Sequence, residues 1–368
     1  MKQNHQLSLM LGLTVFITNC SGPKSSDEQQ TITAAITGYG TKPNGTGVHI
    51  GSTQPESWFG LAQVSATWFM NGFSKHSDGT YWATGYYNAS QTLLSAEAPI
   101  VSAERAGVQL EVQGISTSGS RLSIDVRDAS GTVTTLQHSD LVGLQLLLHV
   151  PDPTGRLSSP YYLRFSSAAS VDSQFGDVDG YQIEHMKPGL LDSSWTSYCK
   201  GASGESQRSV FYQGSQWNPM NGARTDGTSL ITMTCESGSV AKCMSWGYRP
   251  WATGTVAGGQ RVSLRDSHQA CIHMKRASYC GDSKANTIDG TRIIVNDSLS
   301  PAINSGPEDI LEARWTTSGA TCVTNQRHPE ILFIGCPLPL PTCTSGQSGG
   351  YLLTSALPSS GSLLGLIE

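Results

Sequence analysis

Cysteines, charged residues and long apolar runs are all scarce in most of this 368-residue chain. Beyond residue 17 no apolar stretch approaches the roughly 18 residues of a membrane-spanning helix, so we expect none. Only 14% of residues are charged and the formal net charge is -5, which disfavours a nucleic-acid partner. The chain also lacks a Cys-x-x-Cys pair and a P-loop, which argues against those zinc and nucleotide sites.

Short alternating runs of apolar and polar residues indicate a mainly β fold. They occupy 108–114, 121–126 and 131–136, and each is bounded by Gly, Ser or Asp. The run 141–150 is more continuously apolar, which is typical of a strand covered on both faces, and 161–165 supplies another strand. Their spacing of about ten to twelve residues predicts an N-terminal antiparallel sandwich or barrel-like module. A parallel α/β fold is not supported.

The N-terminus has the pattern of an export signal. Lys2 precedes an apolar run from Leu7 to Ile17, which is too short to span a bilayer. The following segment, Ile-Thr-Asn-Cys20-Ser21, resembles the lipobox of bacterial lipoproteins, with Asn19 departing from the usual small residue. The resemblance implies cleavage before Cys20, lipid attachment to its sulfur and, because Ser21 is not Asp, an outer-membrane location. Secretion without lipid is the alternative.

The remaining cysteines are even in number and confined to the second half of the chain. This arrangement predicts a disulfide framework formed in an oxidising compartment. Eight cysteines allow about 105 connectivities, so the pairing stays open, including a local loop closed by the last two. The eight are Cys199, Cys235, Cys243, Cys271, Cys280, Cys322, Cys336 and Cys343.

One short helix is predicted at 267–279. Asp266 with Gln269 forms a capping-box pattern, and basic residues precede Gly281, which suits a helix end. The helical periodicity turns Cys271 toward the core. Cys280 lies about 13.5 Å farther along the axis, beyond the reach of a disulfide, so these two cysteines should not pair with each other.

The same helix offers a catalytic or metal-binding alternative. His268 and Cys271 share a face, as a zinc-ligand pair or a His-activated nucleophile would. Either use requires a free thiolate, which is unfavourable for a core-facing cysteine outside the cytoplasm. We therefore favour a disulfide and a hydrogen-bonded histidine, and we assign no metal, cofactor or catalytic residue.

Other motifs have ordinary structural explanations. Ser348 lies in a Gly-x-Ser-x-Gly pattern without the flanking strand and helix of a nucleophile elbow. Arg249, between aromatic residues, is expected to brace a loop rather than form an exposed recognition patch. The aromatic residues of 58–87 are expected to pack in the core, with carbohydrate stacking as the alternative. The pair Glu184-His185 could serve acid–base chemistry, but chance explains it equally well.

Several cysteine-containing blocks follow one another in residues 195–325 in a characteristic order and spacing. They include Trp195-Thr-Ser-Tyr-Cys199, Ala241-Lys-Cys-Met-Ser-Trp246, Arg276-Ala-Ser-Tyr-Cys280 and Ala320-Thr-Cys-Val323. Together they resemble the ADYC domain, a family of exported proteins best represented in myxobacteria, with Ser278 in place of the name-giving Asp. The resemblance implies an exported, cysteine-rich module and implies no activity.

The sequence thus predicts a lipid-anchored cell-envelope protein with a structural or binding role. Its partners would be the membrane, through the lipid on Cys20, and an envelope or extracellular ligand. The alternative is an exported hydrolase or a zinc-dependent enzyme using His268 and Cys271. We expect little order in the tail. The expected divisions are a signal peptide (1–19), a tether (20–35), a β-rich domain (36–185), an ADYC-like cysteine-rich domain (186–330) and a Pro/Ser/Gly-rich tail (331–368).

Overall fold

The computed structural model is mainly β and describes most of the chain after residue 67. The described residues are 30–31, 42–43, 68–89, 92–151, 158–171, 178–188, 195–200, 205–217, 222–282, 285–287, 291–306, 310–329, 336–337, 339–344 and 350–358.

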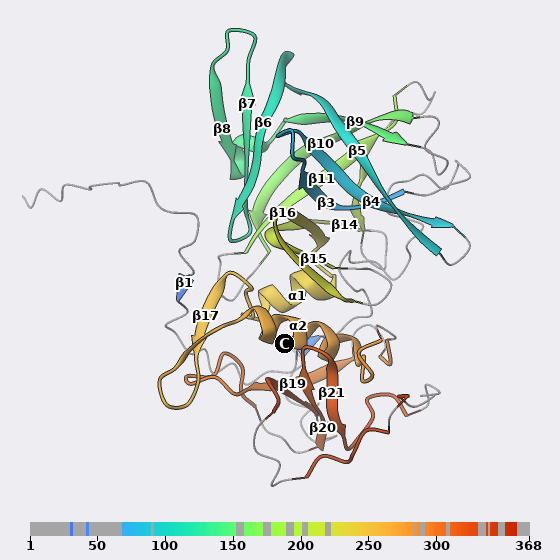
Figure 1. Cartoon of the computed structure of the whole chain (residues 1–368), viewed down its shortest axis with the longest axis vertical. Helices are drawn as coiled ribbons and strands as arrows, with labels where there is room; N and C mark the ends of the chain where they lie inside the picture. Colours follow the sequence, from blue (N-terminus) through green and yellow to red (C-terminus); the bar gives the residue numbers. More distant parts are fainter. Residues whose placement is uncertain are drawn as a thin grey trace, which may run out of the picture.

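The large sheet closes on itself into a ring of antiparallel strands, drawn in blue to yellow in Figure 1. Closure comes from two pairings, β4 with β5 and β16 with β3. In ring order the strands are β3 (Trp68–Lys75), β4 (Tyr81–Ala89), β5 (Thr92–Arg105), β9 (Gln145–Pro151), β10 (Ser158–Ser170), β11 (Asp179–Met186), β15 (Ser209–Trp217) and β16 (Arg224–Cys235). The barrel-like prediction is therefore confirmed.

Three further strands extend the sheet from the far end of β5. They are β6 (Val108–Ser118), β7 (Arg121–Arg127) and β8 (Val133–Gln137), in agreement with the alternating runs of the sequence. Ala106 and Gly107 both have positive φ, 53° and 79°, as the two-residue turn joining β5 to β6 requires.

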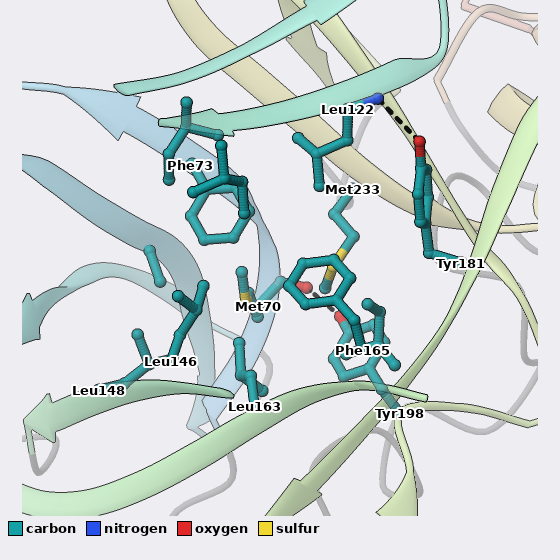
Figure 2. Close-up of a cluster of buried hydrophobic side chains, with 14 of the residues drawn as sticks. Met70, Phe73, Leu122, Leu146, Leu148, Leu163, Phe165, Tyr181, Tyr198 and Met233 are labelled. Carbon is teal, nitrogen blue, oxygen red and sulfur yellow. Dashed lines mark hydrogen bonds between the residues drawn. The ribbon is translucent and has the colours of Figure 1, made fainter. Parts of the chain in front are cut away.

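Apolar side chains from alternate positions fill the ring. On β9, Leu146, Leu148 and Val150 are buried, whereas the residues between them remain partly exposed. The expectation that this segment is covered on both faces was wrong, because only one face of β9 meets the core. Figure 2 shows this cluster, in which the hydroxyl of Tyr181 accepts a hydrogen bond from the amide of Leu122 on β7.

The second half of the described chain forms a separate core below the ring in Figure 1. Its helices, α1 (Ser239–Ser245) and α2 (Arg265–Arg276), lie between β15 and the strands drawn in orange and red. A five-stranded sheet contains β2 (Lys42–Pro43), β19 (Arg292–Asp297), β22 (Leu353–Leu357), β20 (Ile310–Thr316) and β21 (Gly319–Val323), in that order. A three-stranded sheet contains β1 (Gln30–Thr31), β17 (Ala252–Thr255) and β18 (Arg261–Ser263).

Two features differ from the sequence-based expectations. The cysteine-rich half contains α1 in addition to the predicted helix. The prediction of little order in the tail was wrong for Leu353–Leu357, because this segment is β22 and pairs with both β19 and β20. Its apolar residues Leu353 and Ala356 are fully buried, which gives the strand a core to pack against.

Strand β15 belongs to both cores. Its Phe211 points into the ring, whereas Val210 and Tyr212 pack against the helical side. Alternation along a strand sends neighbouring side chains to opposite faces, so β15 serves as a shared wall. Among the short strands, β12 (Thr196–Ser197) pairs with β11, and β13 (Cys199–Lys200) pairs with β14 (Ser206–Gln207).

Candidate functional site

Helix α2 is almost entirely buried and carries the predicted pair His268 and Cys271. It starts at Arg265 and ends at Arg276, against a prediction of 267–279. The predicted capping box does not form, because the N-cap is Leu264 without a side-chain cap. Asp266 instead accepts a hydrogen bond from Nη2 of Arg224 at 3.2 Å. The helix ends early because Ala277 adopts the left-handed conformation, with φ of 48°.

Cys271 faces the core, as predicted, and is bonded to Cys243 of α1. The sulfur is therefore not available as a nucleophile or a metal ligand in this structure. Nε2 of His268 donates a hydrogen bond to the carbonyl of Val240 at 3.0 Å. Burial lowers the pKa of His268 to about 4, so it is neutral at physiological pH. The described residues contain no group of three metal-ligating side chains.

The other three disulfides are Cys199–Cys235, Cys280–Cys336 and Cys322–Cys343. Cys271 and Cys280 do not pair with each other, which agrees with the helix-geometry argument. The suggestion that Cys336 and Cys343 close a local loop was wrong, because Cys336 pairs with Cys280 and Cys343 pairs with Cys322. The disulfides indicate that the protein resides in an oxidising compartment.

The motif 277–280 has a structural explanation residue by residue. The amide of Ser278 donates to the carbonyl of His273 and so caps the helix end. The ring of Tyr279 stacks on Trp315 with centroids 5.5 Å apart, and its hydroxyl donates to Glu312 at 2.9 Å. Cys280 then fixes the chain after the helix through its disulfide. The motif therefore terminates α2 and attaches it to β20.

A fully buried ion pair supports this helix end. Nη2 of Arg327 lies 2.8 Å from Oε2 of Glu312, and neither side chain is exposed. The same guanidinium donates to the carbonyls of Met274 and Lys275 in the last turn of α2. A cation at the C-terminus of a helix satisfies carbonyls that have no intrahelical partner. The pair is therefore a structural support for the helix.

An open cleft of about 430 Å³ lies beside α2, where the start of β16 meets the turn between β20 and β21. Gln269 and His273 of the helix lie deepest, and both side chains are only 4% exposed. The other polar lining residues are Arg224, Asp226, Thr317 and Ser318.

Hydrogen bonds fix the deep residues of the cleft. Nε1 of Trp217 donates to Oε1 of Gln269 at 2.8 Å, which orients the amide, and Nε2 of Gln269 donates to the carbonyl of Gly222. Nε2 of His273 lies 3.0 Å from the carbonyl of Thr317. Burial lowers the pKa of His273 to about 4, so the base of the cleft is neutral at pH 7.

The remaining candidates from the sequence are dispersed. Arg249 is 3% exposed, as expected of a loop brace and not of a surface patch. Glu184 is paired with Arg164, and burial lowers the pKa of His185 to about 4, so these neighbours do not form an acid–base pair. Cys20 and Ser348 lie outside the described residues.

The expected core role of the early aromatics is confirmed for Trp68 and Phe73, which are buried in the ring. It does not hold fully for Tyr81, Trp82 and Tyr86, which are partly exposed. Trp82 stacks on the imidazole of His76, with centroids 4.6 Å apart. One face of its indole is therefore already covered.

Sequence reasoning missed the cleft and the buried ion pair, and it singled out Gln269 and Gly281 only as helix-end residues. Arg224 and Thr317 lie far from each other and from α2 in the chain, and only folding brings them together. Glu312 and Arg327 show no local pattern, because a strand and a following loop place them side by side. No motif in the sequence marks either set.

Comparison with known proteins gives one family. The ADYC domain model matches residues 138–329, more than half of the chain, and the protein belongs to this family. The match begins earlier than the resembling blocks of 195–325, so it includes β9, β10 and β11 of the ring as well as the helices. No curated protein and no solved structure matches the chain.

Proposed function

We propose that this protein is an exported lipoprotein of the cell envelope, attached to the outer membrane through lipid on Cys20. One observation carries the proposal: the disulfides use every cysteine from Cys199 to Cys343. Of the nine cysteines only Cys20 is left, directly after an apolar leader. Four disulfides also require an oxidising compartment. Among the described residues no helix has the length and apolarity to cross a membrane, which fits attachment by lipid.

We further propose that the protein acts by binding an envelope or extracellular ligand. The disulfide at Cys271 and the hydrogen bond at His268 give this pair a role in holding α1 to α2. The cleft beside α2 has polar, partly exposed walls and a rigid, neutral base. Such a surface suits recognition of a polar ligand.

Replacing Cys20 tests the anchoring. The full chain is expressed in a bacterial host with two membranes and labelled with a clickable palmitate analogue. The wild type should be labelled and sediment with the outer membrane, whereas Cys20→Ala should be unlabelled, keep its apolar leader and be absent from the outer membrane. Ser26→Ala, six residues beyond the attachment site, is the matched control and should behave as the wild type. Cys20→Ala in the outer membrane, or an unlabelled wild type, would contradict the proposal.

A second variant tests the membrane to which the protein is sorted. Ser21→Asp places an acidic residue directly after the lipidated cysteine and should retain the protein in the inner membrane without loss of label. Ser21→Ala should leave the distribution unchanged. Equal outer-membrane fractions for both variants would remove the outer-membrane assignment and leave the lipid anchor standing.

A further inference from the structure

The cleft beside α2 contains several polar groups whose bonding capacity is already used. Nε, Nη1 and Nη2 of Arg224 each have a partner, respectively Asp226, the carbonyl of Arg265, and Asp266. The amide of Gln269 is held at both ends by Trp217 and Gly222. These groups shape the cleft, and the charge of Arg224, the cation in its lining, is already paired with the carboxylates of Asp226 and Asp266.

Other groups of the cleft have hydrogen-bonding positions that are not used within the described residues. Oδ2 of Asp226 lies 3.8 Å from Nη1 of Arg265, too far for a hydrogen bond, and the Asp226 side chain is 43% exposed. The hydroxyls of Thr317 and Ser318 line the cleft and have no hydrogen bond within the described part of the chain. The available set is therefore one carboxylate oxygen and two hydroxyls.

The charge of the lining excludes strongly ionic ligands. Arg224 and Asp226 neutralise each other at 3.1 Å, and His273 is neutral through burial. The cleft offers a single open carboxylate oxygen, and the described residues contain no group of three side chains that could hold a metal ion. A ligand hydroxyl, by contrast, can donate to Asp226 and accept from Ser318 or Thr317.

We propose that this cleft is a carbohydrate site, which takes a neutral, hydroxyl-rich saccharide. The inference rests on the binding role proposed above and names its ligand class. A volume of about 430 Å³ accommodates one or two sugar rings, within the usual range of about 300 to 1,000 Å³ for ligand sites. The methyl of Ala223 and the backbone of Gly281 supply the small apolar surface against which a ring can lie.

Saturation-transfer NMR on the lipidated full chain in detergent tests the proposal. The probes are millimolar maltotriose, cellotriose, mannotriose and triacetylchitotriose, with trigalacturonate and triglucosamine as anionic and cationic counterparts. At least one neutral trisaccharide should receive saturation. Ala223→Trp, at an exposed position of the cleft wall, should weaken that binding at least about tenfold by filling the cleft.

Thr228→Trp is the matched control, since it adds the same ring at an exposed position of β16 outside the cleft lining. It should bind as the wild type does, and near-UV circular dichroism of both variants should match the wild type. Absence of a signal from every neutral probe, binding only of charged probes, or binding that survives Ala223→Trp would each overturn the proposal. Anchoring is measured by fractionation, so either proposal can fail while the other stands.

Discussion

Alternating apolar side chains from neighbouring strands fill the ring, whereas the core around α2 mixes apolar side chains with buried charges and disulfides. Only the pair Cys199–Cys235 belongs to the ring cluster; the other three disulfides tie together the helices, β21 and the segments after it. A closed ring of strands bonds its own backbone, so the ring needs fewer cross-links than the second core. The second core consists of short strands and two short helices, whose ends leave many backbone groups without a partner. Disulfides and polar side chains therefore hold these segments in place.

Reduction of the disulfides should produce the largest difference in stability between the two cores. The three bonds of the second core close segments of 28, 56 and 21 residues, each contributing about 3 to 4 kcal/mol in the chain-entropy model. Their loss, on the order of 10 kcal/mol, matches the whole stability of a typical domain. Hydrogen exchange after reduction should show α2 and β20 deprotected while β9 and β10 stay protected.

A double variant sharpens the same comparison. Cys199→Ser with Cys235→Ser removes the ring disulfide alone and should leave α2 protected under oxidising conditions. If β9 and β10 lost protection together with α2 on reduction, the ring would depend on the disulfides after all.

Removing one member of the buried ion pair should have the next largest effect. Glu312→Gln leaves the charge of Arg327 buried without its counter-ion, so the free energy of unfolding should fall by about 3 to 5 kcal/mol. Glu111→Gln breaks an exposed pair with Arg127 on the ring extension and should leave the free energy of unfolding nearly unchanged, because solvent screens that pair. Guanidinium titrations of the two variants measure the difference, and equal losses would refute the contrast between the cores.

Gly281 provides a backbone test of the second core. Its φ is +68°, and an added Cβ would lie 2.1 Å from the carbonyl oxygen of Ser318. Gly281→Ala should therefore destabilise by about 2 to 4 kcal/mol through strain and displacement of the β20–β21 turn. Gly131→Ala has a similar φ of +87° and open space, so it should cost only about 1 kcal/mol. Thermal unfolding compares the two variants. Similar shifts in melting temperature would mean that the close approach of Gly281 to Ser318 does not contribute to stability.

Acid should weaken the second core through its buried histidines. Burial lowers the pKa of both His268 and His273 from 6.5 to about 4, so each stays neutral when folded while the unfolded state takes up a proton below 6.5. Stability is therefore full above pH 6.5 and falls as the pH drops toward 4. His268→Gln should reduce that slope, whereas His149→Gln, on a partly exposed face of β9, should not. An unchanged slope in His268→Gln would contradict this explanation.

The sequence anticipated those parts of the fold that depend on local patterns. Alternation placed β6, β7 and β8, and helical periodicity placed Cys271 in the core. It also excluded a bond between Cys271 and Cys280, since helix rise alone separates them. The closure of the ring could not be read, because the pairing of β16 with β3 joins segments more than a hundred residues apart.

The site was harder to anticipate than the fold. The residues of 277–280 were recognised as a motif, but their task of ending α2 against β20 depends on Trp315 and Glu312 from a distant strand. The capping box failed because α2 already begins at Arg265, which places Asp266 inside the first turn and not at the N-cap. The cleft is assembled from three separate segments, and no local signal reports such an assembly.

The mass of the intact mature protein, alkylated without reductant, tests the central claim most directly. The account predicts a chain starting at Cys20 that carries a diacylglyceryl-type adduct and no alkyl group, because the other eight cysteines are paired. An alkylated cysteine between Cys199 and Cys343 would contradict the disulfide-held core, and an unlipidated Cys20 would contradict the envelope anchor.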